Sequence, residues 1–158
     1  MQTIPIDNSY PDVYCGLGST LTLFPVSAGP ELRIPFGGAI RAGFPSPAQD
    51  FIDLSIDLNQ ELVKHPTSTF FGRVKGESMR DAGISDGDLV IIDKSLPPTN
   101  GRIAVCYLDG EFTMKRIKTD KDCCWLLPAN ENFKPIKVTN ENDFLIWGVV
   151  VHVIKSFD

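Results

Sequence analysis

Residues 102–117 read RIAVCYLDGEFTMKRI and predict a β-hairpin. Two runs rich in β-branched and aromatic residues, Arg102–Leu108 and Glu111–Ile117, flank the dipeptide Asp109-Gly110. Asp-Gly is a strong hairpin signal, because a two-residue type I′ turn needs a positive φ at both central positions. We therefore expect two antiparallel strands in which Leu108 faces Glu111.

The rest of the chain after Pro66 also indicates short strands bounded by turn residues. Besides the hairpin, the expected strands are Thr69–Lys75, Asp88–Asp93, Cys124–Leu127, Lys134–Val138 and Leu145–Ile154. One helix, Leu58–His65, is expected before them, with Asp57 and Gln60 as a capping pair and Pro66 at its end. Strands without βαβ alternation predict a small, mostly β domain that is partly closed or barrel-like.

Residues 1–42 differ from the rest in composition. They hold ten Pro or Gly among 42 residues, against fifteen among the remaining 116, and they show no sustained helical periodicity. We interpret residues 1–42 as an extended N-terminal arm that packs along another surface, rather than a frayed terminus. Residues 43–47, GFPSP, form the joint to the domain at 43–158, because each proline favours extended geometry in the residue before it.

Charge and hydropathy exclude several classes of protein. The chain has 15 basic and 20 acidic residues, a net charge of -5, so direct sequence-specific DNA binding is not expected. The longest nearly apolar stretch, Phe144–Ile154, is too short to span a bilayer. The first basic residue is Arg33, which does not fit the charged start of a secretory signal peptide. We expect a cytoplasmic protein with no membrane association.

The cysteines do not predict a metal site. Cys15, Cys106, Cys123 and Cys124 contain no C-x-x-C pair, and the chain has only two histidines. Neighbouring cysteines in a strand point to opposite faces, so free thiols are the better interpretation than disulfides. No metal and no cofactor are expected.

Ser78 is the candidate nucleophile. It lies in the segment Val74–Asp81, VKGESMRD, just after a strand and behind a glycine. Backbone N–H groups at such a turn are not committed to a strand ladder, and an oxyanion hole requires donors of this kind. The other interpretation is structural: Ser78 would be the N-cap of a short turn that begins at Met79.

A serine nucleophile needs a base, and Lys115 is the candidate. Neither His65 nor His152 is flanked by a triad pattern, and there is no G-x-S-x-G motif. Strand alternation places Lys115 on one face with Thr113 and Ile117, and burial there would lower its pKa and leave a neutral fraction. The other interpretation is a solvated lysine on the polar side of a half-exposed strand.

Taken together, these segments closely resemble the LexA/UmuD family of self-cleaving Ser-Lys peptidases. The resemblance runs from residue 42 to residue 154 and is carried by AGFPSP (42–47), IDLNQ (56–60), GESM (76–79), GISDGDLVIID (83–93), DGEFTMK (109–115) and GVVVHVI (148–154). The order of the Ala-Gly pair, the serine and the lysine is specific to this family.

The resemblance implies a mechanism and site residues. Ser78 matches the nucleophile and Lys115 the general base, and the bond between Ala42 and Gly43 matches the self-cleavage site. The backbone N–H groups of Ser78 and Glu77 would hold the oxyanion. The implied fold is the small β peptidase domain that LexA-like proteins and bacterial signal peptidases share.

The resemblance also implies partners. Repressors of this family carry a helical DNA-binding domain before the cleavage site, and residues 1–42 do not supply one. The chain looks like the branch whose trimmed members serve as the regulatory subunit of an error-prone translesion polymerase in the SOS response. This branch implies a homodimer, a UmuC-like polymerase as partner, and activation by the RecA filament on single-stranded DNA.

Two alternatives remain open on the sequence, and a third is disfavoured. The chain could be a LexA-like self-cleaving regulator of another partner, or a non-catalytic β-domain interaction module. Bacterial signal peptidases share a Ser-Met motif and a catalytic lysine, but membrane helices anchor them, and this chain has no stretch long enough for one.

Overall fold

The structure is a computed structural model that describes residues 21–25, 33–36, 54–120 and 123–157. The elements in chain order are β1 (Leu21–Pro25), β2 (Arg33–Phe36), β3 (Leu54–Asp57), α1 (Leu58–Leu62), a 3-10 turn (Pro66–Ser68), β4 (Thr69–Val74), a 3-10 turn (Arg80–Ala82), β5 (Leu89–Asp93), β6 (Ile103–Leu108), β7 (Glu111–Thr119), β8 (Cys124–Leu127), β9 (Ile136–Val138) and β10 (Phe144–Ile154). Within the described residues no helix is long and apolar enough to cross a membrane.

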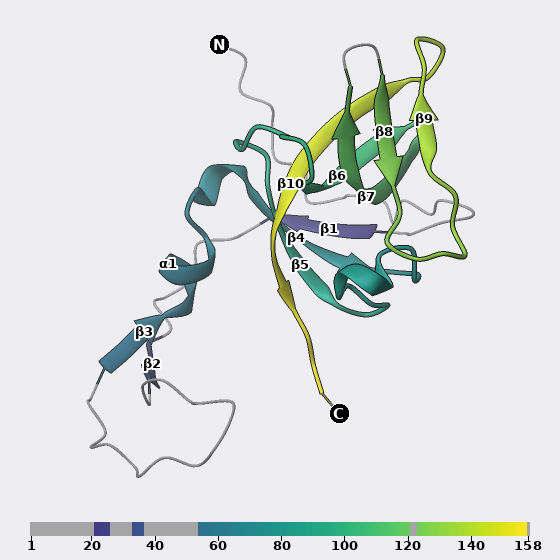
Figure 1. The fold of residues 1–158 in the computed structure, drawn as a ribbon. Helices are drawn as coiled ribbons and strands as arrows, with labels where there is room; N and C mark the ends of the chain where they lie inside the picture. Colours follow the sequence, from purple (N-terminus) through teal and green to yellow (C-terminus); the bar gives the residue numbers. More distant parts are fainter. Residues whose placement is uncertain (1–20, 26–32, 37–53, 121–122, 158) are drawn as a thin grey trace, which may run out of the picture.

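One curled antiparallel sheet forms the body of the molecule. Its eight strands follow the order β1-β4-β5-β10-β6-β7-β8-β9, and β2 pairs with β3 in a separate two-stranded sheet. The long strand β10 joins the two halves: its first part pairs with β6 and its second part with β5 (Figure 1). Two register shifts in β10, between Ile146 and Gly148 and between Val150 and His152, bend it from one half to the other. The predicted mostly β, partly closed fold is confirmed.

The hairpin forms as the sequence predicts. Asp109 has φ 50° and Gly110 has φ 93°, the positive values that a type I′ turn requires. Leu108 pairs with Glu111, and the same register pairs Cys106 with Thr113 and Ala104 with Lys115. The hairpin therefore fixes which residues of β6 lie beside Lys115.

The two faces of the curled sheet pack two apolar clusters. The larger one contains Val74, Met79, Ile84, Val90, Ile92, Val105 and Met114. The smaller one contains Ala104, Cys106, Ile117 and Leu126. Met114 and Ile117 belong to different clusters, because alternate residues of β7 face opposite sides of the sheet. Lys115 alternates with Met114, so it shares the side of Ile117.

The helix is shorter than the sequence predicts. α1 ends at Leu62, and Val63 already has extended geometry, with φ -115° and ψ 92°. The Asp57 side chain caps the helix as expected, but it accepts from the Asn59 N–H at 2.9 Å rather than forming a box with Gln60. The predicted end at His65 is wrong because the His65 carbonyl accepts from the Thr69 hydroxyl at 2.7 Å and from the Ser68 N–H at 3.0 Å, which holds it in the next turn.

Three strands were not expected. β1 and β2 lie within residues 1–42, and β3 lies just before α1. β1 pairs antiparallel with β4 from Leu21 opposite Val74 to Pro25 opposite Phe70, and β2 pairs with β3. The expectation that all strands follow Pro66 is therefore wrong. The segment is extended, as expected, but its extended pieces add to sheets of the later chain. The joint at 43–47 lies outside the described residues.

Candidate active site

A short turn places Ser78 below the surface at the end of β4. Gly76 has φ 96°, and its N–H donates to the Asp86 carboxylate, which closes the turn. The next side chain, Met79, is 2% exposed and packs in the larger apolar cluster. Ser78 itself is 2% exposed. The 3-10 turn that follows begins at Arg80 with Met79 at its N-cap position, so Ser78 is not the N-cap serine of the structural interpretation.

Lys115 reaches Ser78 from β7. Its ammonium nitrogen Nζ lies 3.0 Å from Ser78 Oγ, although 37 residues separate the two in the sequence. Nζ also donates to Thr113 Oγ1 at 2.8 Å and to the Met114 carbonyl at 3.0 Å. Lys115 is only 4% exposed, so the interpretation as a solvated lysine is wrong. The three acceptors match the three protons of an ammonium group and hold Nζ at the serine.

Burial changes the acidity of Lys115. Desolvation lowers its pKa from 10.5 to about 8. A negative charge on the nearby Cys106 would raise that pKa, but burial raises the pKa of the Cys106 thiol to about 12, so the thiol is uncharged at neutral pH. With a pKa of about 8, roughly a tenth of the Lys115 side chains are neutral at pH 7. A neutral amine beside a serine hydroxyl can accept its proton.

A loop from the far end of the sheet contacts both carbonyl groups that flank Ser78. The Ala129 N–H donates to the Ser78 carbonyl at 2.8 Å. The Asn130 side chain donates from Nδ2 to the Glu77 carbonyl at 2.8 Å, and Asn130 is 6% exposed. Asn130 was not predicted from the sequence. In the sequence it stands in a polar turn after β8, and only the long-range fold brings it to the serine.

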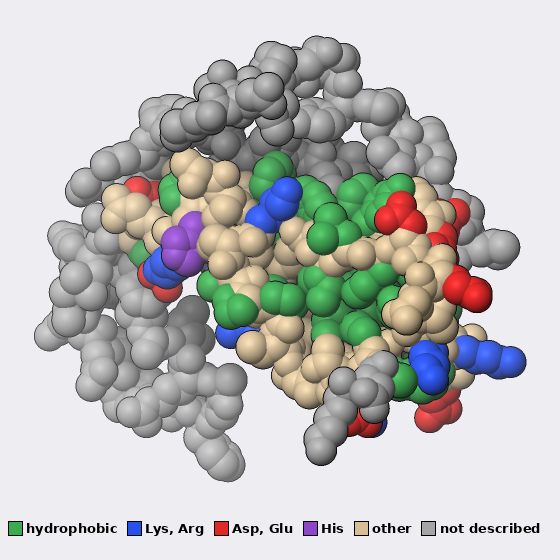
Figure 2. Space-filling model, turned by 90° about the horizontal axis from the view of Figure 1, so that it is seen from above, with side chains coloured by type: hydrophobic (Ala, Val, Ile, Leu, Met, Phe, Trp, Pro, Cys, Tyr) green, Lys and Arg blue, Asp and Glu red, His purple; other side chains and the backbone are tan. Residues whose placement is uncertain are grey.

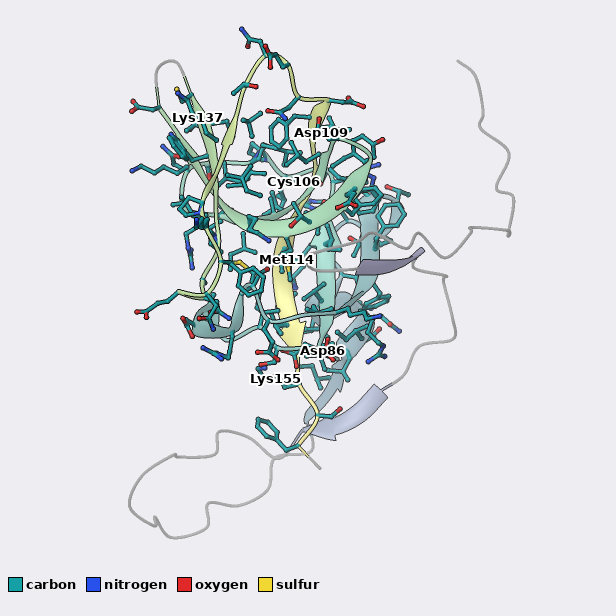
Figure 3. The ribbon with its side chains drawn as sticks, turned by 90° about the vertical axis from the view of Figure 1, so that its right-hand side faces the viewer. Asp86, Cys106, Asp109, Met114, Lys137 and Lys155 are labelled. Carbon is teal, nitrogen blue, oxygen red and sulfur yellow. The ribbon has the colours of Figure 1, made fainter. Side chains whose placement is uncertain are left out.

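Met114, the neighbour of Lys115 in β7, lies near the middle of the sheet (Figure 3). In Figure 3, Cys106 and Met114 lie between Asp109 on one side and the pair Asp86 and Lys155 on the other. Lys155 Nζ lies 2.6 Å from the Asp88 carboxylate, which ties the chain after β10 to the residue just before β5. Lys115 directly follows Met114 in β7, so the candidate base lies in the same part of the sheet.

His65 takes part in a separate polar cluster. Its Nδ1 lies 2.6 Å from Asp93 Oδ2, while the hydroxyls of Ser68 and Ser95 both donate to Asp93 Oδ1. Burial alone would raise the pKa of Asp93, but hydrogen bonds from Ser95, His65 and Ser68 outweigh it and lower that pKa to about 2. Both serines bond to the carboxylate and not to the imidazole. The cluster is therefore not arranged as a Ser-His-Asp triad.

The structure brings together three of the predicted site residues. Ser78 and Lys115 are in contact, and Glu77 supplies the peptide group just before the serine. The predicted scissile pair, Ala42 and Gly43, lies outside the described residues. Among the described residues no group of three His, Cys, Asp or Glu side chains is placed to hold a metal ion, and Cys106, Cys123 and Cys124 are free thiols.

Comparisons with known proteins point to one family. The pattern of the S24-like peptidases matches residues 35–151. Protein MucA of Salmonella typhimurium is 42% identical over 114 residues, which cover 72% of this chain and 77% of that protein. Protein ImpA of Shigella flexneri is 38% identical over 129 residues, 78% of this chain and 83% of that protein. Protein SamA of Salmonella typhimurium is 39% identical over 120 residues, 74% of this chain and 83% of that protein.

Proposed function

Because the chain belongs to the S24-like peptidases, as a UmuD-like member of the LexA/UmuD family, we propose that it is a serine peptidase that cuts its own chain between Ala42 and Gly43. The observation that carries this proposal is the buried 3.0 Å contact between Lys115 Nζ and Ser78 Oγ. A buried lysine with a pKa of about 8 gives the serine a base without histidine or metal.

The proposed reaction is peptide hydrolysis through an acyl-enzyme. Neutral Lys115 takes the proton of the Ser78 hydroxyl while Oγ attacks the carbonyl carbon of Ala42. The backbone N–H groups of Ser78 and Glu77 hold the resulting oxyanion. Collapse of the tetrahedral intermediate breaks the bond to Gly43, and the Lys115 ammonium gives its proton to the leaving amine. Water, deprotonated by Lys115, then hydrolyses the ester and releases residues 1–42.

The proposed domain division follows from the same cut. Residues 1–42 form the arm that is removed, and residues 43–158 form the peptidase domain with both reacting side chains. Small residues on both sides of the bond suit this role, because Ala42 and Gly43 let the backbone approach a serine that is itself only 2% exposed. The released piece would include β1, the outermost strand of the main sheet.

For the cellular role, we propose that the chain is a cytoplasmic protein that serves as the regulatory subunit of an error-prone translesion DNA polymerase in the SOS response. The resemblance to the family supports a homodimer, a UmuC-like polymerase as partner and the RecA filament on single-stranded DNA as activator. The net charge of -5 favours protein partners over direct DNA binding. Figure 2 shows apolar side chains gathered on one face, as expected for a surface that meets another protein.

The test is the mass of the chain after incubation at alkaline pH, or with RecA, single-stranded DNA and a nucleotide. Wild type should yield a fragment that begins at Gly43, and Ser78→Ala should stay intact. Gly43→Glu should also stay intact, because a bulky charged side chain cannot approach the buried serine. Gly38→Glu, the same change elsewhere in the arm, is the matched control and should be cut normally.

Two results contradict the proposal. Cutting of Ser78→Ala at the wild-type rate would remove the serine from the mechanism. An intact wild-type chain under both conditions would favour the non-catalytic interaction module.

A further inference from the structure

Asn130 is a buried polar side chain that takes no part in the reaction proposed above. Both ends of its amide are engaged: Nδ2 donates to the Glu77 carbonyl at 2.8 Å, and Oδ1 accepts from the Asn132 N–H at 3.0 Å. The residue is 6% exposed. Its two hydrogen bonds require opposite ends of the amide, so they fix the orientation of the side chain.

The bond to Glu77 determines the direction of a neighbouring N–H group. The peptide between Glu77 and Ser78 is trans and planar, so the Glu77 carbonyl and the Ser78 N–H point in opposite directions. A group that holds the carbonyl on one side therefore aims the N–H to the other. The Ala129 N–H holds the next carbonyl, that of Ser78, at 2.8 Å. The loop after β8 thus fixes the peptide groups on both sides of the serine.

We propose that Asn130 is a positioning residue for the oxyanion site: its amide holds the Glu77–Ser78 peptide so that the Ser78 N–H points at the charge that develops on the substrate carbonyl. The inference rests on the proposed function and adds a residue to the same site. Asn130 acts in two ways. It prevents rotation of the peptide, and its hydrogen bond to the carbonyl polarises the peptide and makes the N–H a stronger donor.

The test compares Asn130→Asp with Asn132→Asp in the full chain. Asp has the shape of Asn and keeps an oxygen for the Asn132 N–H, but a carboxylate cannot donate to the Glu77 carbonyl. Asn132 is exposed on the same loop, so its variant is a control for the added charge. Asn130→Ala serves as a second variant that removes the donor without adding a charge. Circular dichroism and thermal unfolding check that each variant is folded.

The readout is the self-cleavage rate between pH 6 and 10. We expect Asn130→Asp and Asn130→Ala to lower the alkaline plateau rate about ten- to a hundred-fold, because loss of an oxyanion donor costs up to about a thousand-fold and here the donor is only misaimed. The midpoint of the pH profile should not move in Asn130→Ala, which adds no charge near Lys115. In Asn130→Asp the added carboxylate should raise the pKa of Lys115 and move the midpoint to higher pH. Asn132→Asp should stay within about two-fold of wild type.

The outcomes separate this inference from the proposed function. Folded Asn130 variants that cleave at the wild-type plateau rate contradict the role of Asn130 and leave the Ser78–Lys115 mechanism standing. A lower rate of Asn130→Ala with a shifted midpoint shows general loosening of the site and also contradicts it. A wild-type chain that never cleaves overturns both. As a readout without cleavage, the ¹⁵N shift of Ser78 and the carbonyl ¹³C shift of Glu77 should change in Asn130→Asp but not in Asn132→Asp.

Discussion

At the scale of single residues, the burial of Lys115 lowers its pKa, which supports its proposed role as the base but reduces the stability of the folded protein at neutral pH. The folded protein holds this side chain 4% exposed with a pKa of about 8, against 10.5 for the free side chain. The unfolded chain therefore binds more protons than the folded one between those two values. The free energy of unfolding is lowered at pH 7 by about 3 kcal/mol through this group, and the penalty fades as the pH rises from 8 to 10.5.

We predict that Lys115→Met raises the free energy of unfolding at pH 7 by about 1–2 kcal/mol and abolishes self-cleavage. Methionine fills a similar volume without a charge, although it leaves the hydroxyls of Ser78 and Thr113 without the lysine. The gain should disappear near pH 10.5, where wild type no longer carries the penalty. Chemical denaturation at several pH values measures it. Lys118→Met, an exposed lysine on the same strand, should show no such pH dependence, and equal behaviour of the two variants would contradict the account.

Part of this site could be predicted from the sequence. Alternation along β7 predicted that Lys115 shares a face with Thr113, and Thr113 is indeed its hydrogen-bond partner. The burial of that face could not be predicted from the strand itself, because it depends on residues distant in the sequence, such as Ser78, which lies against Lys115 from 37 residues away. The role of Asn130 could not be predicted for the same reason. Its partner, the Glu77 carbonyl, lies 53 residues away and is a backbone group that every residue possesses.

At the scale of elements, local signals gave the reliable predictions. The hairpin at Asp109-Gly110 is defined by two neighbouring residues with positive φ, so the sequence predicts its register correctly. The helix end was wrong by three residues because the His65 carbonyl accepts from the Thr69 hydroxyl and the Ser68 N–H, which holds His65 in the next turn. β1 was missed because it has no partner nearby in the sequence. It pairs with β4, about fifty residues away.

Substitution of Gly148 or Gly110 is expected to destabilise the fold, each for a different reason. A Cβ on Gly148, at the first register shift of β10, would lie 2.7 Å from Ile92 Cγ2, a buried branched atom that cannot move freely. A Cβ on Gly110 would meet nothing within 4 Å, but its φ of 93° strains any other residue. We predict that Gly148→Ala lowers the free energy of unfolding by about 2–3 kcal/mol and Gly110→Ala by about 1 kcal/mol. Urea denaturation would contradict this if the order were reversed.

At the scale of the whole molecule, strands from residues 1–42 pair with strands from residues 43–158. β1 adds to the free edge of β4, and β4 leads directly into the turn that carries Ser78. β2 pairs with β3, which leads into α1. The strands on either side of the predicted cut, β2 and β3, are therefore paired with each other. Removal of residues 1–42 would take away an outer strand but no interior strand of the main sheet.

The role of Lys115 as the base is tested by the rate of self-cleavage from pH 6 to 10 for wild type and Lys115→Arg. With the pKa of Lys115 at about 8, the wild-type rate should rise about ten-fold per pH unit below pH 8 and level off above it. Lys115→Arg should be inactive throughout, because a guanidinium stays protonated over this range. Lys118→Arg, the same change at an exposed position of β7, should follow the wild-type profile. A wild-type rate that is flat across the range, or an active Lys115→Arg protein, would show that Lys115 is not the base.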